Sequence, residues 1–158
     1  MTIEDLIAKH EGCEANIYND SMGIPTIGIG HNLKANPLPD GMNPPLTQDQ
    51  IDQLFQADLA VATNAVTKAL PWFSSIDSVR QAVLIDMTFN MGIGTLLTFH
   101  HTLGFIQDGD YTSAANGMLA SLWAKQVGIR ATEDANMMTS GLWPDDINFP
   151  KPPPPANV

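Results

Sequence analysis

The sequence predicts an α+β protein that is predominantly helical and carries a small antiparallel β-sheet in its N-terminal part. Two features of the sequence support this prediction. Residues 16–33 combine β-branched residues with glycine and turn residues, a pattern typical of short strands joined by tight turns. Between Thr47 and Trp143 the only proline is Pro71, so nearly all of that region can be helical. The 158 residues correspond to about one domain, which can bury a core without disulfides or metals.

The N-terminal elements follow from capping and turn residues. A short helix is expected over residues 2–11, because Thr2 can cap it and acidic residues lie in its first turn. Gly12 is a suitable stop signal for this helix. A hairpin or three-stranded antiparallel sheet is expected over residues 16–33, in which Pro25 indicates an edge strand or the first residue of a strand.

A loop and a long helix are expected next. Residues 34–46 are rich in proline and predict the loop. Thr47 and Gln50 match a capping box, and apolar residues at helical spacing follow them. This pattern predicts a connecting helix over about 48–68 that ends before Pro71.

Further helices are expected in the C-terminal part of the chain. The later part of the stretch 77–91 is apolar on almost every side, as in a buried central helix. Shorter helices are predicted near 95–107, 111–122 and 130–139. The side chains expected to fill the core, which fall at helical spacing, are Met87, Phe89, Met91, Met118, Met137 and Met138. The expected division of the domain, which spans 1–143, is an N-terminal lobe over 1–60, a connecting helix over 47–69 and a helical C-terminal lobe over 70–143, followed by a proline-rich tail over 144–158.

The composition excludes several classes of partner. There are 7 Lys and Arg residues against 17 Asp and Glu residues, which gives a net charge of −10. Nucleic-acid binding and docking on anionic membranes both need clusters of Lys and Arg, so neither is expected. The N-terminus lacks the basic segment and apolar run of a secretion signal. Cys13 is the only cysteine, and the adjacent His100 and His101 diverge on a helix, so no metal site is expected.

Two carboxylates are candidates for chemistry. Glu11 ends the first predicted helix, and Asp20 lies nine residues later in the predicted turn of the hairpin. A helix end and an adjacent turn can face one cleft, and a glycosidase needs a pair of carboxyl groups in different surroundings. In the alternative interpretation, Glu11 is an exposed last-turn residue and Asp20 a turn former, and their spacing by itself favours this alternative.

Longer motifs surround these two residues. They follow one another along the chain as His10-Glu11-Gly12, Tyr18-Asn19-Asp20, Pro25-Thr26-Ile27-Gly28-Ile29-Gly30-His31 and Phe89-Asn90-Met91-Gly92. Together they resemble the active-site signature of the T-even-type phage lysozymes, the endolysins of glycoside hydrolase family 24. The resemblance covers about residues 1–143. It implies a lysozyme-like fold of two lobes with the cleft between them, and no cofactor.

The resemblance implies catalytic roles for three residues. Glu11 matches the general acid that protonates the leaving glycosidic oxygen. Asp20 matches the carboxylate that, together with Thr26, orients and activates a water on the opposite face of the sugar, which implies inversion. A lytic transglycosylase keeps the glutamate but lacks the aspartate base, so the presence of Asp20 and Thr26 argues against that class.

Further residues match positions that support the site or contact the substrate, namely His31, Leu33, Asn90, Phe99 and Arg130. The resemblance implies that His31 lies near the cleft floor and pairs with an acid, and a purely structural role is the alternative. It implies that Arg130 pairs with Glu11. It places Asn90 near Glu11 and the substrate, with a buried core amide as the alternative. Trp123 is expected to fill the core of the C-terminal lobe rather than to stack on sugar.

The expected function is that of a muramidase, which hydrolyses the β-1,4 bond between N-acetylmuramic acid and N-acetylglucosamine in peptidoglycan during phage-induced host lysis. A lytic transglycosylase and a weakly catalytic wall-binding or virion-structural module are the alternatives. The expected partner is the glycan strand, bound by a monomer with neither nucleic acid nor a stable membrane association. The protein is expected to stay in the host cytoplasm until a holin opens the way to the periplasm and cell wall.

Overall fold

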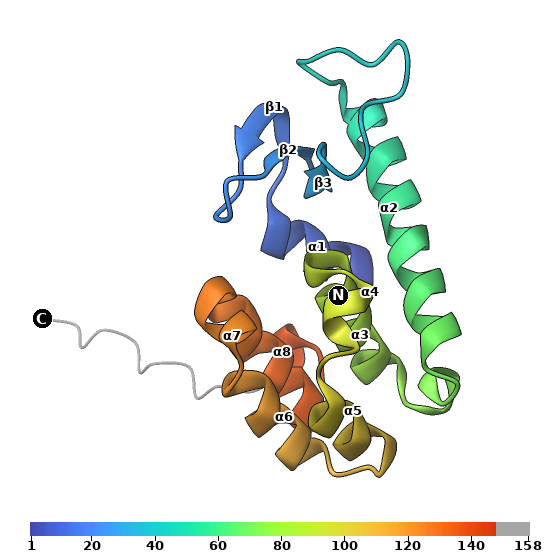
Figure 1. Ribbon diagram of the computed structural model, residues 1–158, viewed down its shortest axis with the longest axis vertical. Helices are drawn as coiled ribbons and strands as arrows, with labels where there is room; N and C mark the ends of the chain where they lie inside the picture. Colours follow the sequence, from blue (N-terminus) through green and yellow to red (C-terminus); the bar gives the residue numbers. More distant parts are fainter. Residues whose placement is uncertain (148–158) are drawn as a thin grey trace, which may run out of the picture.

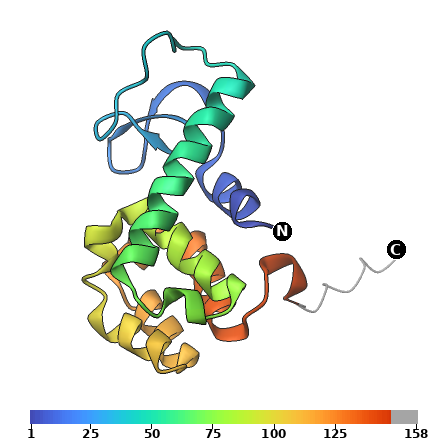
Figure 2. The same ribbon diagram turned by 90° about the vertical axis from the view of Figure 1, so that its right-hand side faces the viewer.

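The computed structural model describes residues 1–147 and confirms the predicted α+β, predominantly helical fold (Figure 1). A three-stranded antiparallel sheet lies at one end of the molecule, and a group of helices lies at the other. The strands are β1 (Glu14–Asn19), β2 (Pro25–Gly28) and β3 (His31–Asn32), in the order β1-β2-β3. Helix α2 (Gln48–Ala69) runs from the sheet to the helical group and connects them (Figures 1 and 2).

The helical group confirms two predicted helices, those over 77–91 and 130–139, and corrects two. Its elements are η1 (Phe73–Ser75), α3 (Ser78–Met91), α4 (Ile93–Leu96), α5 (His100–Gln107), α6 (Tyr111–Leu119), α7 (Leu122–Val127), α8 (Ile129–Ser140) and η2 (Pro144–Asp146), where η denotes a 3₁₀ turn. The prediction of single helices over 95–107 and 111–122 was wrong, because each stretch contains a break. In the first stretch, the backbone N–H and the hydroxyl of Thr98 both donate to the backbone carbonyl of Thr95, which ends the helical turn. In the second stretch, Ser121 caps a new helix.

Helix α1 (Ile3–Glu11) ends with the first candidate carboxylate. Its start is fixed by a capping box, in which the side chains of Thr2 and Asp5 each accept the backbone N–H of the other. Gly12 has a φ angle of 72°, in the left-handed region that favours glycine. The chain therefore leaves the helix directly after Glu11 and turns into β1.

The register of the sheet places the second candidate carboxylate in a turn. Asn19 of β1 pairs with Pro25 of β2, so Asp20 lies in the connection between these strands. Thr26 pairs with Tyr18 on one side and with Asn32 on the other. Pro25 is the first residue of its strand, as predicted, but β2 is the central strand and not an edge strand.

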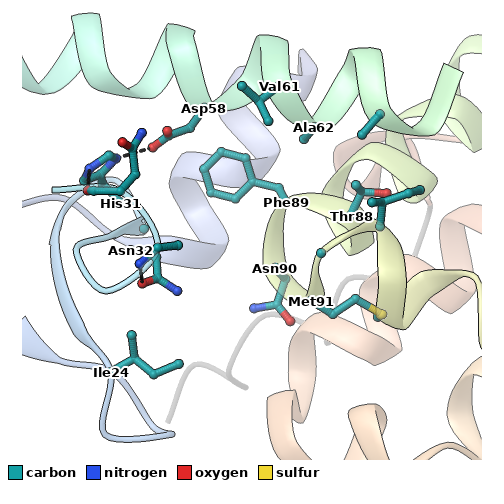
Figure 3. Close-up of a pocket in the computed structure, with 16 residues that line it drawn as sticks. Ile24, His31, Asn32, Asp58, Val61, Ala62, Thr88, Phe89, Asn90 and Met91 are labelled. Carbon is teal, nitrogen blue, oxygen red and sulfur yellow. Dashed lines mark hydrogen bonds and ion pairs between the residues drawn. The ribbon is translucent and has the colours of Figure 1, made fainter. Parts of the chain in front are cut away.

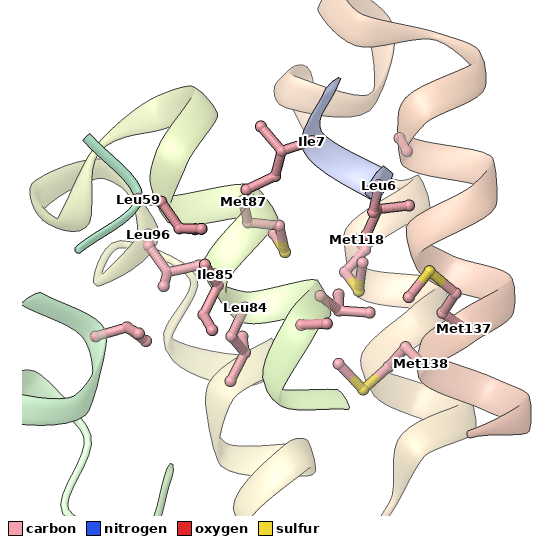
Figure 4. Close-up of a cluster of buried hydrophobic side chains, with 14 of the residues drawn as sticks. Leu6, Ile7, Leu59, Leu84, Ile85, Met87, Leu96, Met118, Met137 and Met138 are labelled. Carbon is pink, nitrogen blue, oxygen red and sulfur yellow. The ribbon is translucent and has the colours of Figure 1, made fainter. Parts of the chain in front are cut away.

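The core of the helical group includes one face of α1. Leu6 and Ile7 belong to the same buried cluster as Met87 of α3, Met118 of α6 and Met137 of α8 (Figure 4). Full burial of a side chain of this size stabilises the fold by roughly 1.5–3 kcal/mol. Helix α1 is thus anchored against the helical group, although the chain continues from it into the sheet.

Two of the apolar side chains predicted to fill the core are only partly buried. Met87, Met118, Met137 and Met138 are fully buried, which confirms that part of the prediction. Phe89 and Met91 are only partly buried, because they lie near the end of α3 that faces the sheet. Their outer surfaces line the cleft described below.

The predicted proline-rich tail begins with η2, and residues 148–158 of it lie outside the described part of the chain. None of the helices within residues 1–147 is both long and apolar enough to cross a membrane.

Candidate active site

Two adjoining cavities form a cleft between the sheet and the helices. The smaller has a volume of about 280 Å³ and is lined by Glu11, Asp20 and Thr26. The larger has a volume of about 590 Å³ and extends toward His31 and α2 (Figure 3). The two cavities share the lining residues Ile24, Gly30, Asn32, Phe89, Asn90 and Met91.

Glu11 reaches the cleft from the end of α1. Its Oε1 atom accepts a hydrogen bond of 2.6 Å from Nη1 of Arg130 on α8. Its other side lies against Gly30, where an added Cβ would lie 2.8 Å from Oε2 of Glu11. The glutamate is therefore held between a cation of the helical group and the backbone of the sheet.

Asp20 reaches the cleft from the turn between β1 and β2. Its Oδ1 atom accepts the backbone N–H groups of Met22 and Ile24, at 2.8 and 2.9 Å. Asp20 is thus a turn former, as the alternative interpretation had it, and it also lines the smaller cavity together with Glu11. Its Oδ2 atom has no hydrogen bond to any other residue in the described part of the chain, which leaves this oxygen available to a water or a substrate.

Thr26 belongs to the central strand and lines the smaller cavity together with Asp20. Its hydroxyl donates to the backbone carbonyl of Ile24 at 2.8 Å, and the residue is buried. Since the hydroxyl proton is used in this bond, the oxygen can only accept from a further partner.

Arg130 joins Glu11 to a buried network that the sequence interpretation missed. Its Nε and Nη2 atoms each donate to a carboxylate oxygen of Asp86 at 2.9 Å. Although burial opposes the charged form, Asp86 and Glu11 raise the pKa of the Arg130 guanidinium above its usual range, so the group remains a cation.

The network continues to the protein surface through α1. Nδ1 of His10 lies 3.2 Å from both oxygens of Asp86, and Nε2 lies 2.9 Å from Glu133. Lys9 completes the chain with a bond of 2.6 Å to Glu133. A signal for the network was present in the sequence, since Asp86 is a single charge in an otherwise apolar stretch of α3, and such a charge needs a partner when buried.

His31 is fixed between the sheet and α2 (Figure 3). Nδ1 contacts Oδ2 of Asp58 at 2.7 Å, and Nε2 donates to the backbone carbonyl of Asn36 at 2.8 Å. The hydrogen bond to Asp58 raises the pKa of His31 and outweighs the opposing effect of burial. The ring therefore ties β3 to α2 and supports the wall of the larger cavity.

Asn90 is exposed and lines both cavities, so it is not a buried core amide. Its Oδ1 atom accepts a hydrogen bond of 2.8 Å from Nε1 of Trp123 on α7. This bond fixes the orientation of the amide and leaves its NH₂ group as a donor. Trp123 is buried, as predicted, but it also borders the smaller cavity.

Leu33 and Phe99 do not line either cavity. Both are partly buried and pack against the hydrophobic core, so the structure gives them no direct contact with the cleft. His100 and His101 begin α5, outside the cleft.

The fold and the cleft together define a class of protein. A small sheet and a helical group enclose a cleft lined by one carboxyl group from a helix end and another from a sheet turn, and a pair of carboxyl groups in a cleft is what a glycoside hydrolase needs. A family model described as phage lysozyme matches residues 8–136. The chain belongs to this phage lysozyme family, and its activity is of the lysozyme type.

Known proteins of several kinds are similar to the chain. Probable T4-type lysozyme 1 of Dictyostelium discoideum is 29% identical over 162 residues, which cover 89% of this chain and 95% of the relative. Endolysin of Salmonella phage P22 is 28% identical over 121 residues, covering 75% of this chain and 78% of the relative. Pre-baseplate central spike protein Gp5 of Enterobacteria phage T4 is 27% identical over 161 residues, covering 89% of this chain and 28% of the relative.

Proposed function

We propose that the protein is a muramidase that hydrolyses the β-1,4 bond between N-acetylmuramic acid and N-acetylglucosamine in peptidoglycan, with inversion at the sugar carbon. The observation that carries this proposal is that Glu11, Asp20 and Thr26 line one cavity although they come from a helix, a turn and a strand. The lysozyme and endolysin names of the relatives support the same class of substrate.

In the proposed reaction Glu11 is the general acid and Asp20 is the general base. Protonated Glu11 donates its proton to the glycosidic oxygen as the bond from this oxygen to the anomeric carbon breaks. A water donates one hydrogen bond to Oδ2 of Asp20 and the other to the Thr26 hydroxyl, which can only accept. The water oxygen attacks the anomeric carbon from the opposite face, and its proton passes to Asp20.

Asn90 holds the substrate in this proposal. The NH₂ group of Asn90 donates to a sugar oxygen, and its bond to Trp123 keeps it in place. Because the amide is oriented before the substrate arrives, little rotational freedom is lost on binding.

The proposed biological role is lysis of a bacterial host by a monomer that acts on glycan strands. In this role the protein waits in the host cytoplasm until a holin gives it access to the periplasm and cell wall, as expected for an endolysin. A second candidate, a weakly catalytic wall-binding or virion-structural module, is supported by the similarity to the pre-baseplate central spike protein of phage T4. A lytic transglycosylase is the third candidate, but it has no use for a base such as Asp20.

Product analysis on purified peptidoglycan tests the proposal. Mass spectrometry should find reducing N-acetylmuramic acid ends, and proton NMR at early times should find the α-anomer as the first product. Anhydro-sugar ends would identify a transglycosylase, and the absence of any new ends would favour a structural module. A β-anomer as first product would contradict the inverting mechanism.

A further inference from the structure

Asp134 of α8 has no place in the reaction described above, and its surroundings are unusual. The side chain is completely buried, and neither of its carboxyl oxygens has a hydrogen-bond donor among the described residues. An isolated ionised carboxylate in such a position would cost far more free energy than a folded protein of this size has to spare.

Two titratable side chains lie close to Asp134. Asp86 and His10 each place an atom within 4.8 Å of Asp134 and of one another. The charged and titratable groups of the cluster come from three helices: Lys9, His10 and Glu11 of α1, Asp86 of α3, and Arg130 and Glu133 of α8. An ionised Asp134 would make four carboxylates face two permanent cations and one histidine.

The two buried carboxyl groups are not equivalent. Burial disfavours ionisation of Asp86, but Arg130 and His10 hold the pKa of Asp86 far below its usual range. Burial and the adjacent charge of Asp86 instead raise the pKa of Asp134 well above its usual range. When two carboxyl groups share a buried site, one of them retains the proton, and the group without a cationic partner is the one that does so here.

We propose that Asp134 is a neutral carboxylic acid that donates a hydrogen bond to Asp86, and that it is a positioning residue for Glu11. The donated bond holds the Asp86 carboxylate in the orientation that binds Arg130 through two nitrogens. Arg130 in turn holds Glu11 through Nη1. The catalytic part of this inference rests on the proposed function, whereas the protonation of Asp134 does not.

A divalent cation is the alternative occupant of this cluster. Asp86, Asp134 and His10 offer one ligand atom each at suitable separations. The guanidinium of Arg130 already binds both oxygens of Asp86 and supplies the positive charge there. A proton on Asp134 therefore completes the network with less accumulation of positive charge than a metal would.

Carboxyl-carbon NMR of protein labelled at aspartate tests the protonation directly. At pH 7 one aspartate carboxyl resonance should have the chemical shift of a protonated acid, and this resonance should be missing from Asp134→Asn. A spectrum in which every aspartate is ionised at pH 7 would overturn the proposal. So would a rise in Tm on addition of Zn²⁺, Mn²⁺ or Ca²⁺ that Asp134→Asn abolishes, since the cation would then replace the proton.

The pH dependence of stability gives a second test without any activity measurement. When a carboxyl group keeps its proton in the folded state but not in the unfolded state, the folded protein loses stability as pH rises above the group's usual pKa of about 4. From pH 5 to 7, the folding equilibrium constant of wild type should therefore fall relative to that of Asp134→Asn by about tenfold per pH unit. The control Asp108→Asn, at an exposed position, should show no such trend. A difference between wild type and Asp134→Asn that does not vary with pH would contradict the proposal.

Enzyme kinetics test the positioning role. Asparagine can still donate to Asp86 through its amide, whereas leucine of similar size cannot. Asp134→Leu should lower kcat about three- to tenfold more than Asp134→Asn, with a similar KM for both. Equal kcat values in two variants that both fold would show that the donated hydrogen bond does not position Glu11, even if the NMR result holds.

Discussion

The carboxyl group of Glu11 occupies the space into which any side chain at position 30 would project. A Cβ built on Gly30 would lie 2.8 Å from both Cδ and Oε2 of Glu11. The φ angle of Gly30 is +65°, which L-residues with side chains rarely adopt. Glycine is therefore needed at this position for two reasons. It allows the positive φ angle of the turn before β3, and it leaves room for the carboxyl group of the proposed general acid.

Replacement of this glycine should impair catalysis more than stability. We expect Gly30→Ala to destabilise the fold by about 1–2 kcal/mol through backbone strain. Displacement of Glu11 by the new methyl group should lower kcat/KM by about 10²-fold. Chemical denaturation and hydrolysis of purified peptidoglycan measure the two effects.

Gly41 provides the matched control for this variant. Its φ angle is +87°, and an added Cβ would meet nothing within 4 Å. Gly41→Ala should therefore show a similar loss of stability with wild-type activity. If the two variants had comparable activity, the prediction that a methyl group at position 30 displaces Glu11 would be wrong.

Loss of the proton donor should abolish hydrolysis. In Glu11→Gln the amide cannot protonate the leaving oxygen, and we expect the rate on peptidoglycan to fall by about 10²–10⁴-fold with an unchanged circular dichroism spectrum. Glu14→Gln removes an exposed carboxylate a few residues away and should retain full activity. A Glu11→Gln enzyme that kept more than about a tenth of the wild-type rate would contradict the role of Glu11.

Loss of the proposed base, Asp20, should lower the rate of hydrolysis to a similar extent while the turn between β1 and β2 stays folded. The amide oxygen of Asp20→Asn can still accept the N–H groups of Met22 and Ile24, so the turn should persist. Because the amide cannot take a proton from water, the rate should fall by about 10²–10⁴-fold. Retention of anhydro-sugar production by this variant would instead indicate a transglycosylase.

The His31–Asp58 pair should stabilise the protein most at mildly acidic pH. Asp58 raises the pKa of His31 in the folded state, so the contribution is complete below the usual histidine pKa and is lost as pH rises through the folded value. We expect Asp58→Asn to lower the free energy of unfolding by about 1–3 kcal/mol at pH 5.5 and by less at pH 9. Urea denaturation at both pH values measures this difference.

Asp52→Asn, on the same helix but exposed, is the control for this pair. Its effect on stability should not vary between the two pH values. A larger loss of stability for Asp58→Asn at pH 9 than at pH 5.5 would reverse the sign of the predicted linkage.

Salt should accelerate the enzyme on whole cell walls. The net charge is −10, and the acidic residues that line the cleft are Glu11, Asp20 and Asp58, with no Lys or Arg among the described lining residues. Repulsion from the anionic wall is screened as the Debye length falls from ~30 Å at 0.01 M to ~10 Å at 0.1 M. The rate of turbidity loss of outer-membrane-stripped cells should therefore rise up to about 0.1–0.2 M salt. A steady decrease from 0.01 M would show that local positive charge dominates.

Much of the secondary structure could be predicted because its determinants are local. Thr2 and Thr47 cap helices through residues three positions away, and Gly12 ends a helix through its own backbone angle. The breaks after Leu96 and after Leu119 could not be predicted as reliably, because a hydroxyl that turns back on its own helix leaves only a weak signal in the sequence.

Glu11 and Asp20 could be proposed from the sequence, since their motifs are contiguous and resemble those of a known family. Their position in one cavity depends on tertiary structure. The apolar face of α1 is buried among the helices, whereas the turn that holds Asp20 belongs to the sheet. Only the packing of these two parts brings the two carboxyl groups into one cavity.

The helix caps, the turns and the identity of the groups that could do chemistry follow from the sequence, because these features depend on residue type and on neighbours a few positions apart. The tertiary structure alone decided the partners of Arg130, which are 44 positions away for Asp86 and 119 for Glu11. It also decided that Asp134 is buried without a donor. Charge pairing in a low-dielectric interior depends on distances in space, which local sequence patterns do not encode.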